Sequence, residues 1–305
     1  MAGLLVIGDV VTDVVARHRS PVAPGTDTEA DIVLRPGGSG ANTAAWAAHL
    51  GADARLLARA GYDTGAWHVG ELTRAGVTTH VRIDPGSPTA VVIAMVDAAG
   101  ERTMLTTRGA GRRIGPGDWD DALLDGVGRM HVSGYTLFAP PGLELVRLAT
   151  RAALDRGAAV SVDPASTGFL REFGPERFLR ETSGATLIVP NLDEALLLTG
   201  APGAATAAEA LSVRYGTAIV KLGADGALLA AGGRVTRHVP GRPGGETVDS
   251  TGAGDAFAAG VLTALLGGAA DHEAVEAGCR AGAAAVTRLG GRPVAALAGE
   301  PSHGG

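Results

Sequence analysis

The residues best suited to chemistry lie in a small-residue loop, residues 248–255, that opens an apolar helix. Gly252, Ala253 and Gly254 carry little or no side chain, so a ligand can approach their backbone N–H groups closely. These groups also lie at the positive end of a helix dipole, which favours a phosphate or charge developing on oxygen. Asp255 would repel such an anion, but it makes sense as the base that takes a proton from an attacking hydroxyl. A tight turn with an acidic N-cap is the alternative.

A second glycine-rich loop, residues 36–43, runs into an alanine-rich helix that ends before Gly51. It contains Gly38 and Asn42. Asn42 either caps the helix or offers its donor and acceptor to the hydroxyls of a sugar. A dinucleotide-binding fingerprint is excluded, because Thr43 stands where the third glycine would be.

The elements that must position these loops alternate between strand and helix along most of the chain. Residues 4–8 form a continuous apolar run, as expected of a strand buried on both faces of a parallel sheet. Asp13 follows that strand, where open α/β sheets place ligands, although an exposed turn acid is the alternative. The alternation predicts an α/β fold, with a central, mostly parallel sheet flanked by helices in one domain over residues 1–305.

Two segments depart from this alternation. Residues 10–35 read as short strands joined by a turn, and residues 89–107 read as a hairpin. We expect these strands to lie apart from the main sheet and to form a lid over the ligand site.

Composition limits the partners that the chain could have. The formal charge of −6 argues against a broad nucleic-acid surface. The single cysteine, Cys279, excludes an intrachain disulfide and multi-cysteine zinc motifs. No signal peptide or spanning segment is apparent, so we expect a soluble, cytoplasmic protein with no membrane partner.

Four stretches together carry a resemblance to a known family. They are residues 37–44, residues 190–195 with Asn191 and Glu194, residues 221–226, and residues 249–257 with Asp255. Their order and spacing resemble the signatures of the ribokinase-like (PfkB) carbohydrate kinases over roughly residues 1–295. The resemblance implies that the γ-phosphoryl group of ATP passes to a hydroxyl, usually the primary hydroxyl of a sugar. It also implies the sheet and lid described above, and a lid that often forms a homodimer contact.

The resemblance also implies roles for the residues of the two glycine loops. Asp255 would be the general base, and the amides of residues 252–255 would form the anion hole. Asp13, Gly38 and Asn42 would hold the sugar.

Further roles concern ATP and metal ions. Asn191 and Glu194 would orient Mg²⁺ and the phosphates, with Glu194 acting through water. Asp249 and Thr251 match positions that bind K⁺ in some members. The nucleotide would be lined by Gly223, Gly226, Cys279 and Lys221, for which a plain strand-end charge is the alternative.

Departures from the family pattern leave the substrate open. Ser39 stands where ribokinases usually carry lysine, and Ala165 replaces the asparagine of a D-x-N element common in fructokinases. Arg102 and Arg108 either face solvent or reach a phosphate on a sugar phosphate. Ribose and fructose are candidate acceptors, a nucleoside kinase is the alternative, and a non-catalytic sugar or nucleotide sensor is a third hypothesis.

Overall fold

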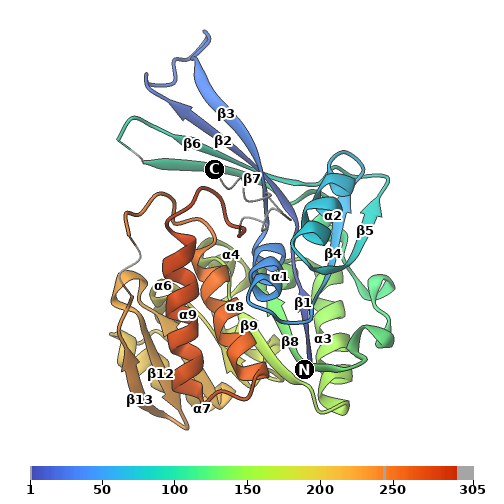
Figure 1. Ribbon diagram of the computed structural model, residues 1–305, viewed down its shortest axis with the longest axis vertical. Coiled ribbons are helices and arrows are strands. Elements are labelled where there is room, and N and C mark those ends of the chain that lie inside the picture. Colours follow the sequence, from blue (N-terminus) through green and yellow to red (C-terminus); the bar gives the residue numbers. More distant parts are fainter. Residues whose placement is uncertain (1, 100, 243–244, 294–305) are drawn as a thin grey trace, which may run out of the picture.

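The structure, a computed structural model, describes residues 2–99, 101–242 and 245–293. A nine-stranded sheet runs through the body in the order β13-β12-β11-β10-β9-β8-β1-β4-β5 (Figure 1). It is parallel from β5 to β11, and the β11-β12-β13 edge is antiparallel. The strands are β1 (Gly3–Ile7), β4 (Ala54–Gly61), β5 (Thr78–Asp84), β8 (Val127–Ser133), β9 (Ala159–Asp163), β10 (Leu187–Ile188), β11 (Thr217–Lys221), β12 (Ala227–Ala231) and β13 (Arg234–Val239).

Helices cover both faces of this sheet because its strands are apolar on both sides. Leu4 and Val6 of β1 face one buried cluster, and Leu5 and Ile7 face the other. The first face is covered by α1 (Ser39–His49), α2 (Gly65–Arg74), α8 (Ala253–Leu266) and α9 (Asp271–Ala285). The second is covered by α3 (Pro140–Asp155), α4 (Thr167–Phe173), α5 (Pro175–Glu181), α6 (Leu192–Thr199) and α7 (Ala204–Tyr215).

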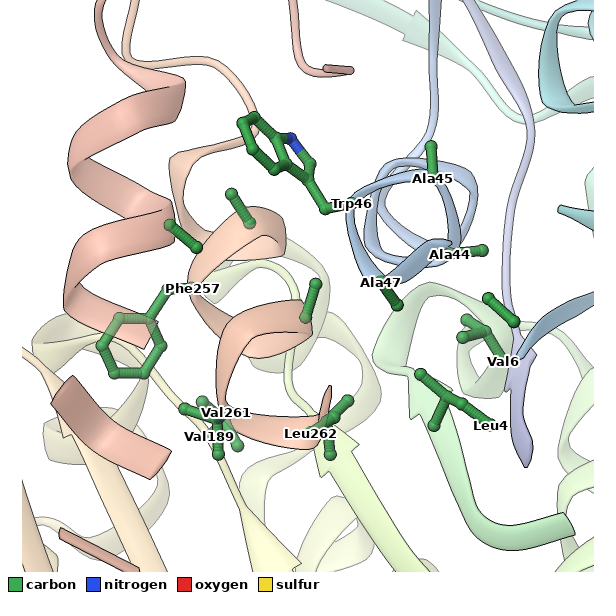
Figure 2. Close-up of a cluster of buried hydrophobic side chains, with 14 of the residues drawn as sticks. Leu4, Val6, Ala44, Ala45, Trp46, Ala47, Val189, Phe257, Val261 and Leu262 are labelled. Carbon is green, nitrogen blue, oxygen red and sulfur yellow. The ribbon is translucent and has the colours of Figure 1, made fainter. Parts of the chain in front are cut away.

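The alanine and glycine content allows the helices of the first face to pack closely. In Figure 2 Ala44, Ala45 and Ala47 project from different sides of α1, and Trp46 reaches toward α8. A Cβ on Gly260 of α8 would lie 2.7 Å from the carbonyl oxygen of Ala277 in α9. Glycine is therefore needed there for the two backbones to approach this closely.

The lid is a separate four-stranded sheet in the order β3-β2-β6-β7, and it extends above the body in Figure 1. Its strands are β2 (Val11–His18), β3 (Ala30–Gly37), β6 (Ala90–Val96) and β7 (Arg102–Thr107). These strands lie largely within residues 10–35 and 89–107, where the sequence analysis expects lid strands, and β3 extends beyond residue 35. One face carries Asp13, Val92 and Thr106 and lines a cleft, while the opposite face carries Leu34 and Leu105.

The topology places the cleft where the order of the sheet changes direction. β1 pairs with β4 on one side and with β8 on the other. Chain connections therefore diverge from β1, which leaves a crevice at the carboxyl ends of β1 and β8. The predicted parallel sheet is confirmed and this crevice holds the acidic residues described below.

Some elements were not predicted. β5 is an edge strand in which four of seven residues are exposed and polar residues predominate, so it lacks the apolar run that marks a buried strand. α4 and several 3₁₀ segments, including η4 (Gly134–Phe138) and η5 (Gly223–Asp225), are too short to show helical periodicity. Residues 294–305, at the end of the predicted domain, lie outside the described residues.

Among the described residues, no single helix has both the length and the apolar character needed to cross a bilayer. The bent pair α6 and α7 meets that test by length and composition alone.

Candidate active site

A cleft of about 330 Å³ lies between the lid and the carboxyl ends of the sheet strands. Both glycine loops reach it: Gly38, Ser39 and Asn42 come from the first, and Gly252, Gly254 and Asp255 from the second. The remaining predicted residues that line it are Asp13, Asn191, Glu194, Lys221 and Thr251. The fold therefore brings together most of the residues that the sequence analysis selected.

Asp255 is held by two side chains of the first loop. Its Oδ1 accepts a hydrogen bond from Ser39 Oγ at 2.8 Å, and its Oδ2 accepts one from Asn42 Nδ2 at 2.9 Å. Burial raises the pKa of Asp255 to about 7, and the two hydrogen bonds oppose that rise. A carboxylate with a pKa near neutrality can both accept a proton and release it at physiological pH.

Asn42 does not cap helix α1. The N-cap is Gly38, with no side-chain hydrogen bond to the helix terminus, and Asn42 lies one turn further on. Its amide nitrogen binds Asp255, while its buried Oδ1 has no hydrogen-bond partner within the described residues. The capping alternative is therefore wrong, and Asn42 positions the carboxylate of Asp255 in this structure.

The amino terminus of α1 is filled by Asp9, which the sequence analysis did not select. Asp9 Oδ1 accepts a hydrogen bond from Gly40 N at 3.0 Å, and its carbonyl oxygen accepts one from Ala41 N at 3.2 Å. Burial raises the pKa of Asp9, although backbone hydrogen bonds to its carboxylate oppose the rise. A Cβ on Gly40 would lie 2.5 Å from the Cα of Gly8, so the loop needs glycine to reach the end of β1.

The amino terminus of α8 is open by comparison. In the described part of the chain, no acceptor takes the amide hydrogens of Gly254 and Asp255, whereas Ala253 N donates to Ser250 O at 3.3 Å. Ala253 also does not line the cleft. The anion hole stays a prediction, and the amides available for it are those of Gly252, Gly254 and Asp255.

Lys221 brings a positive charge to this terminus. Its Nζ lies 3.3 Å from where a Cβ on Gly254 would be, and 2.6 Å from Asp163 Oδ2. Burial lowers the pKa of Lys221, but Asp163, Glu194 and Asp255 outweigh burial and raise it overall. The ammonium therefore stays charged, and it lies beside the amino terminus of α8.

Asn191 and Glu194 form a capping box at the start of α6. Asn191 N donates to Glu194 Oε2 at 2.9 Å, and Glu194 N donates to Asn191 Oδ1 at 2.8 Å. Burial, and then the nearby Asp163, raise the pKa of Glu194 to about 7. Glu194 thus has a structural role, yet it is also a buried carboxylate beside Lys221 at the cleft.

Asp13 lies above the first loop on the cleft face of the lid. A Cβ on Gly37 would lie 2.1 Å from Asp13 Oδ2, so this glycine makes room for the carboxylate. Burial and the nearby Asp9 raise the pKa of Asp13 to about 7, although the charge of Arg292 opposes them. The exposed-turn alternative is wrong, because Asp13 is a partly buried strand residue that lines the cleft.

Aromatic side chains form one wall of the cleft. Tyr135 and Phe169 line it, with their ring centroids 5.7 Å apart, and Phe138 stacks on Phe169. Arg108 holds this wall to the lid by donating to the carbonyl oxygens of Tyr135 at 2.6 Å and Phe138 at 2.8 Å. Arg108 is therefore partly buried and engaged with the backbone, whereas the side chain of Arg102 lies outside the described residues.

A segment that follows α9 holds the two glycine loops together. Gly290 N donates to Asp249 Oδ2 at 3.0 Å, and Asp249 Oδ1 accepts from Thr251 N at 2.9 Å. A Cβ on Gly291 would lie 2.4 Å from Asn42 Nδ2, and one on Gly252 would lie 2.5 Å from Gly291 Cα. The predicted K⁺ residues, Asp249 and Thr251, thus lie together where this segment meets the second loop.

Three predicted nucleotide residues do not line the cleft. Gly223 is exposed in η5, and Gly226 packs against the backbone of residues 239–241. Cys279 is buried in α9, and burial raises the pKa of its thiol. Their contact with a nucleotide stays a prediction.

Sequence reasoning did not select Asp9, Ser39 or Asp163 as site residues. Asp9 and Asp163 could have been found, because each is an acid at the carboxyl end of an apolar strand, β1 or β9. Ser39 carries no such signal, since its importance comes from a contact with Asp255 across 216 residues of sequence.

Comparisons with known proteins agree with this geometry. Residues 1–296 match the pfkB family carbohydrate kinases. The chain is 29% identical over 272 residues to a fructokinase from Klebsiella pneumoniae, covering 85% of this chain and 83% of the other. It is 30% identical over 303 residues to an ATP-dependent ribose-1-phosphate kinase from Halopiger xanaduensis, covering 96% and 94%. The solved structure of an adenosine kinase from Sinorhizobium meliloti has a TM-score of 0.88, with 26% identity and 96% of both chains covered.

Fold, cleft and relatives define an ATP-dependent sugar kinase. The chain belongs to the pfkB family of carbohydrate kinases.

Proposed function

We propose that the protein transfers the γ-phosphoryl group of ATP to a hydroxyl, by preference a primary one, of a small sugar such as ribose or fructose. The observation that carries this proposal is the placement of Asp255. Its buried carboxylate lies in the first turn of α8, next to the open amides of Gly254 and Asp255. In this arrangement the carboxylate accepts the proton of the incoming hydroxyl, while the amides stabilise charge on the transferred group.

The residues around the α8 terminus suit the phosphates of ATP and Mg²⁺. Lys221 supplies a charge that stays positive, and Glu194 supplies a buried carboxylate. Mg²⁺ prefers oxygen ligands and keeps several waters, so Glu194 would hold it through water. Bound Mg²⁺ would neutralise charge on the phosphates. We also propose that the protein works in the cytoplasm, a compartment that holds ATP.

Asp13, Gly38 and Asn42 would hold the sugar. Asp13 comes from the lid and Gly38 and Asn42 come from the first glycine loop, and all three line the cleft together with Lys221 and Glu194. The acceptor hydroxyl would then reach Asp255 from the side of the first loop, while the phosphates of ATP would reach it from the side of the second loop. Phosphoryl transfer requires the attacking and leaving oxygens to lie roughly in line, and this placement would allow it.

A specific feature favours a nucleoside as a second candidate acceptor. The wall formed by Tyr135 and Phe169, with Val92 and Met104 of the lid, is largely apolar and presents two aromatic rings. A ribose alone would leave this wall uncovered, whereas a base could stack on it. One structural neighbour, the Sinorhizobium meliloti protein, is described as an adenosine kinase.

A single panel tests both candidates. We expect ATP-dependent ADP release with one of ribose, fructose, ribose 1-phosphate, adenosine or inosine. A kcat/KM at least tenfold higher for a nucleoside than for any sugar would replace the sugar proposal by the nucleoside one. ADP release with no acceptor on the panel, from protein that still binds ATP, would contradict both.

We also propose that K⁺ binds where Asp249 and Thr251 meet the segment after α9. Asp249 already fixes the amides of Thr251 and Gly290, so the neighbouring carbonyl oxygens are held in place. K⁺ would stabilise the second loop and thereby the anion hole. Replacing Na⁺ by K⁺ at equal concentration should raise kcat several-fold, and equal rates in the two salts would remove the proposal.

Finally, we propose a homodimer through the outer face of the lid. Pairing of the strands aligns Leu34, Val14, Ile93 and Leu105 in one row on the face turned away from the cleft. Leu34 is 63% exposed and Leu105 is 56% exposed, which is costly for a monomer. Light scattering should give a dimer, and Leu34→Asp should give a folded monomer.

A further inference from the structure

A second cavity lies at the opposite edge of the sheet, about 530 Å³ in volume. It is formed at the amino ends of β8, β10 and β11, by Arg129, Leu187 and Thr217, together with Leu265 at the end of α8. Arg129 is four residues before the end of β8, so the cavity is roughly 13 Å from the cleft along that strand. It is therefore separate from the kinase site.

Three charged side chains line this cavity, and their charges are not paired. Arg129, Arg214 and Asp271 sum to one positive charge. Within the described residues, neither guanidinium makes a hydrogen bond or a close ion pair, although Asp271 attracts Arg129 at longer range. Ser183 and Thr217 bring two hydroxyl groups that are also without side-chain hydrogen bonds there.

Arg129 is the unusual member of this group. It is only partly exposed, and burial lowers the pKa of its guanidinium, with Asp271 as the compensating charge. Most other partly buried arginines of the described chain are satisfied: Arg59 pairs with Asp84 and Asp118, and Arg108 binds two carbonyls. An arginine that is desolvated without a close partner is costly, so its retention in a cavity needs an explanation.

Arg129 is also unusual for its position, because the strand residues beside it on the same face of the sheet are apolar. Neighbouring strand residues on this face are Leu187 and Ile219, which belong to the buried apolar cluster. A leucine or valine at position 129 would extend that cluster without any desolvated charge. The guanidinium instead opens to the cavity, where its planar fork of donors matches a carboxylate or a phosphate.

We propose that this cavity is a binding site for a small doubly charged oxyanion, held in a bidentate manner by Arg129 and by the charge of Arg214. Ser183 and Thr217 would donate to the remaining oxygens of the ligand. Asp271 faces the same space and weakens binding by repulsion. The oxyanion is a phosphate group or a dicarboxylate, and the volume accommodates a small organic molecule that carries it.

Titration calorimetry on the full chain tests the site. The protein is saturated with a non-hydrolysable ATP analogue and Mg²⁺, so that the phosphate sites of the cleft are occupied, and is titrated with inorganic phosphate and, separately, with malonate. We expect one of the two to bind with a Kd below about 10 mM. Arg129→Met should weaken that binding at least tenfold, Arg214→Met three- to tenfold, and Asp271→Asn should tighten it two- to threefold.

Arg180→Met is the matched control, because Arg180 is an exposed arginine on α5, outside the cavity. It should leave the Kd within twofold of the unaltered protein. If Arg129→Met does not fold, the exposed Arg214 and Asp271 variants still decide the outcome. A Kd that none of these three substitutions changes by more than twofold overturns the proposal, as does the absence of binding by both anions. A preference for phosphate or for malonate identifies the kind of oxyanion.

Discussion

The two glycine loops begin their helices in similar ways but treat the helix amino terminus differently. At α1 the chain fills the terminus itself, because Asp9 accepts the amide hydrogens of Gly40 and Ala41. At α8 the amides of Gly254 and Asp255 have no acceptor within the described residues, and the ammonium of Lys221 lies beside them. A glycine loop before a helix is therefore not sufficient to define an anion site. What matters is whether a carboxylate from elsewhere in the chain already occupies it.

This difference assigns separate tasks to the two loops. The first supplies Ser39 and Asn42, which hold the carboxylate of Asp255, and its own helix dipole is neutralised. The second supplies the carboxylate and leaves its helix dipole available to a phosphoryl group. Each of the following predictions alters one side of this division.

The largest expected effect is that of Asp255→Asn. Without the base, kcat should fall at least about 10³-fold, a barrier increase of about 4 kcal/mol, while ATP binding persists. Stability should change in the opposite direction. The folded pKa of about 7 lies above the unfolded value, so the folded state holds an extra proton between about pH 4 and 7. The unfolding free energy therefore falls as pH rises through that window, and removing the charge should raise Tm at pH 8.

Two measurements check this prediction: steady-state ADP release and thermal unfolding at pH 8. Asn42 can turn its amide so that its buried, unpartnered Oδ1 accepts a hydrogen bond from the amide introduced at position 255. Asp193→Asn, an exposed first-turn acid of α6, is the control and should change neither quantity. A variant that retains more than a tenth of kcat would refute the role of Asp255 as base.

The second largest effect is expected from Gly252→Ala, because the added methyl group would clash at the amino terminus of α8. Gly252 has a φ of 73°, and an added Cβ would lie 2.5 Å from Gly291 Cα. We expect kcat/KM to fall about 10²-fold, equivalent to about 2.7 kcal/mol, because the amides must shift. Gly268→Ala is a matched control, since Gly268 has a φ of 82° with nothing within 4 Å. It should cost about 1 kcal/mol of stability and no activity. Equal loss of activity in the two variants would contradict the steric explanation.

A third effect is expected when the carboxylate of Asp9 is removed from the amino terminus of α1. Asp9→Ala leaves the amide of Gly40 buried without its acceptor, so we expect a loss of roughly 1–3 kcal/mol in unfolding free energy. The first loop should loosen, and kcat/KM should fall by about tenfold. Asp9→Asn keeps an acceptor oxygen and should recover most of the stability in urea unfolding. If Asp9→Asn is no more stable than Asp9→Ala, the hydrogen bond from the amide of Gly40 does not account for the loss of stability.

The smallest effect is a shift of the pH profile. Protonation of Asp255 makes it unable to accept a proton, so kcat/KM should decline as pH falls below about 7. The hydrogen bond from Ser39 lowers the pKa of Asp255, and Ser39→Ala should therefore raise it. The acid limb should move upward by about half to one pH unit, equivalent to roughly 0.7–1.4 kcal/mol. A limb that stays in place or moves downward would show that Ser39 does not act on the base.

The sequence was enough to predict the parallel sheet, the lid and most of the cleft. Buried strands and glycine loops are local patterns, and the carboxyl ends of parallel strands converge on one edge of a sheet, as Asn191 and Lys221 show. The role of each residue in the site was less predictable. Asn42 looks equally suited to capping α1 or to binding a sugar, and its contact with Asp255 depends on how α1 packs against α8.

The unpredicted parts depend on contacts between distant residues. The pairing of Lys221 with Asp163 and the filling of α1 by Asp9 leave no trace in local periodicity. Ala165 is an instructive case. Its φ of 74° is in the left-handed region, where asparagine is tolerated better than alanine, so the missing asparagine of the D-x-N element leaves a strained residue at the cleft.

The segment at Gly290 and Gly291 has a consequence for the timing of synthesis. It touches Asp249, Asn42 and Gly252, and so joins the two loops, yet it follows every helix and strand of the described chain. A nascent chain can bury its sheet and most of its helices before this segment leaves the ribosome. The machinery for transfer, by contrast, is completed by residues made late, so a growing polypeptide gains its architecture before its activity.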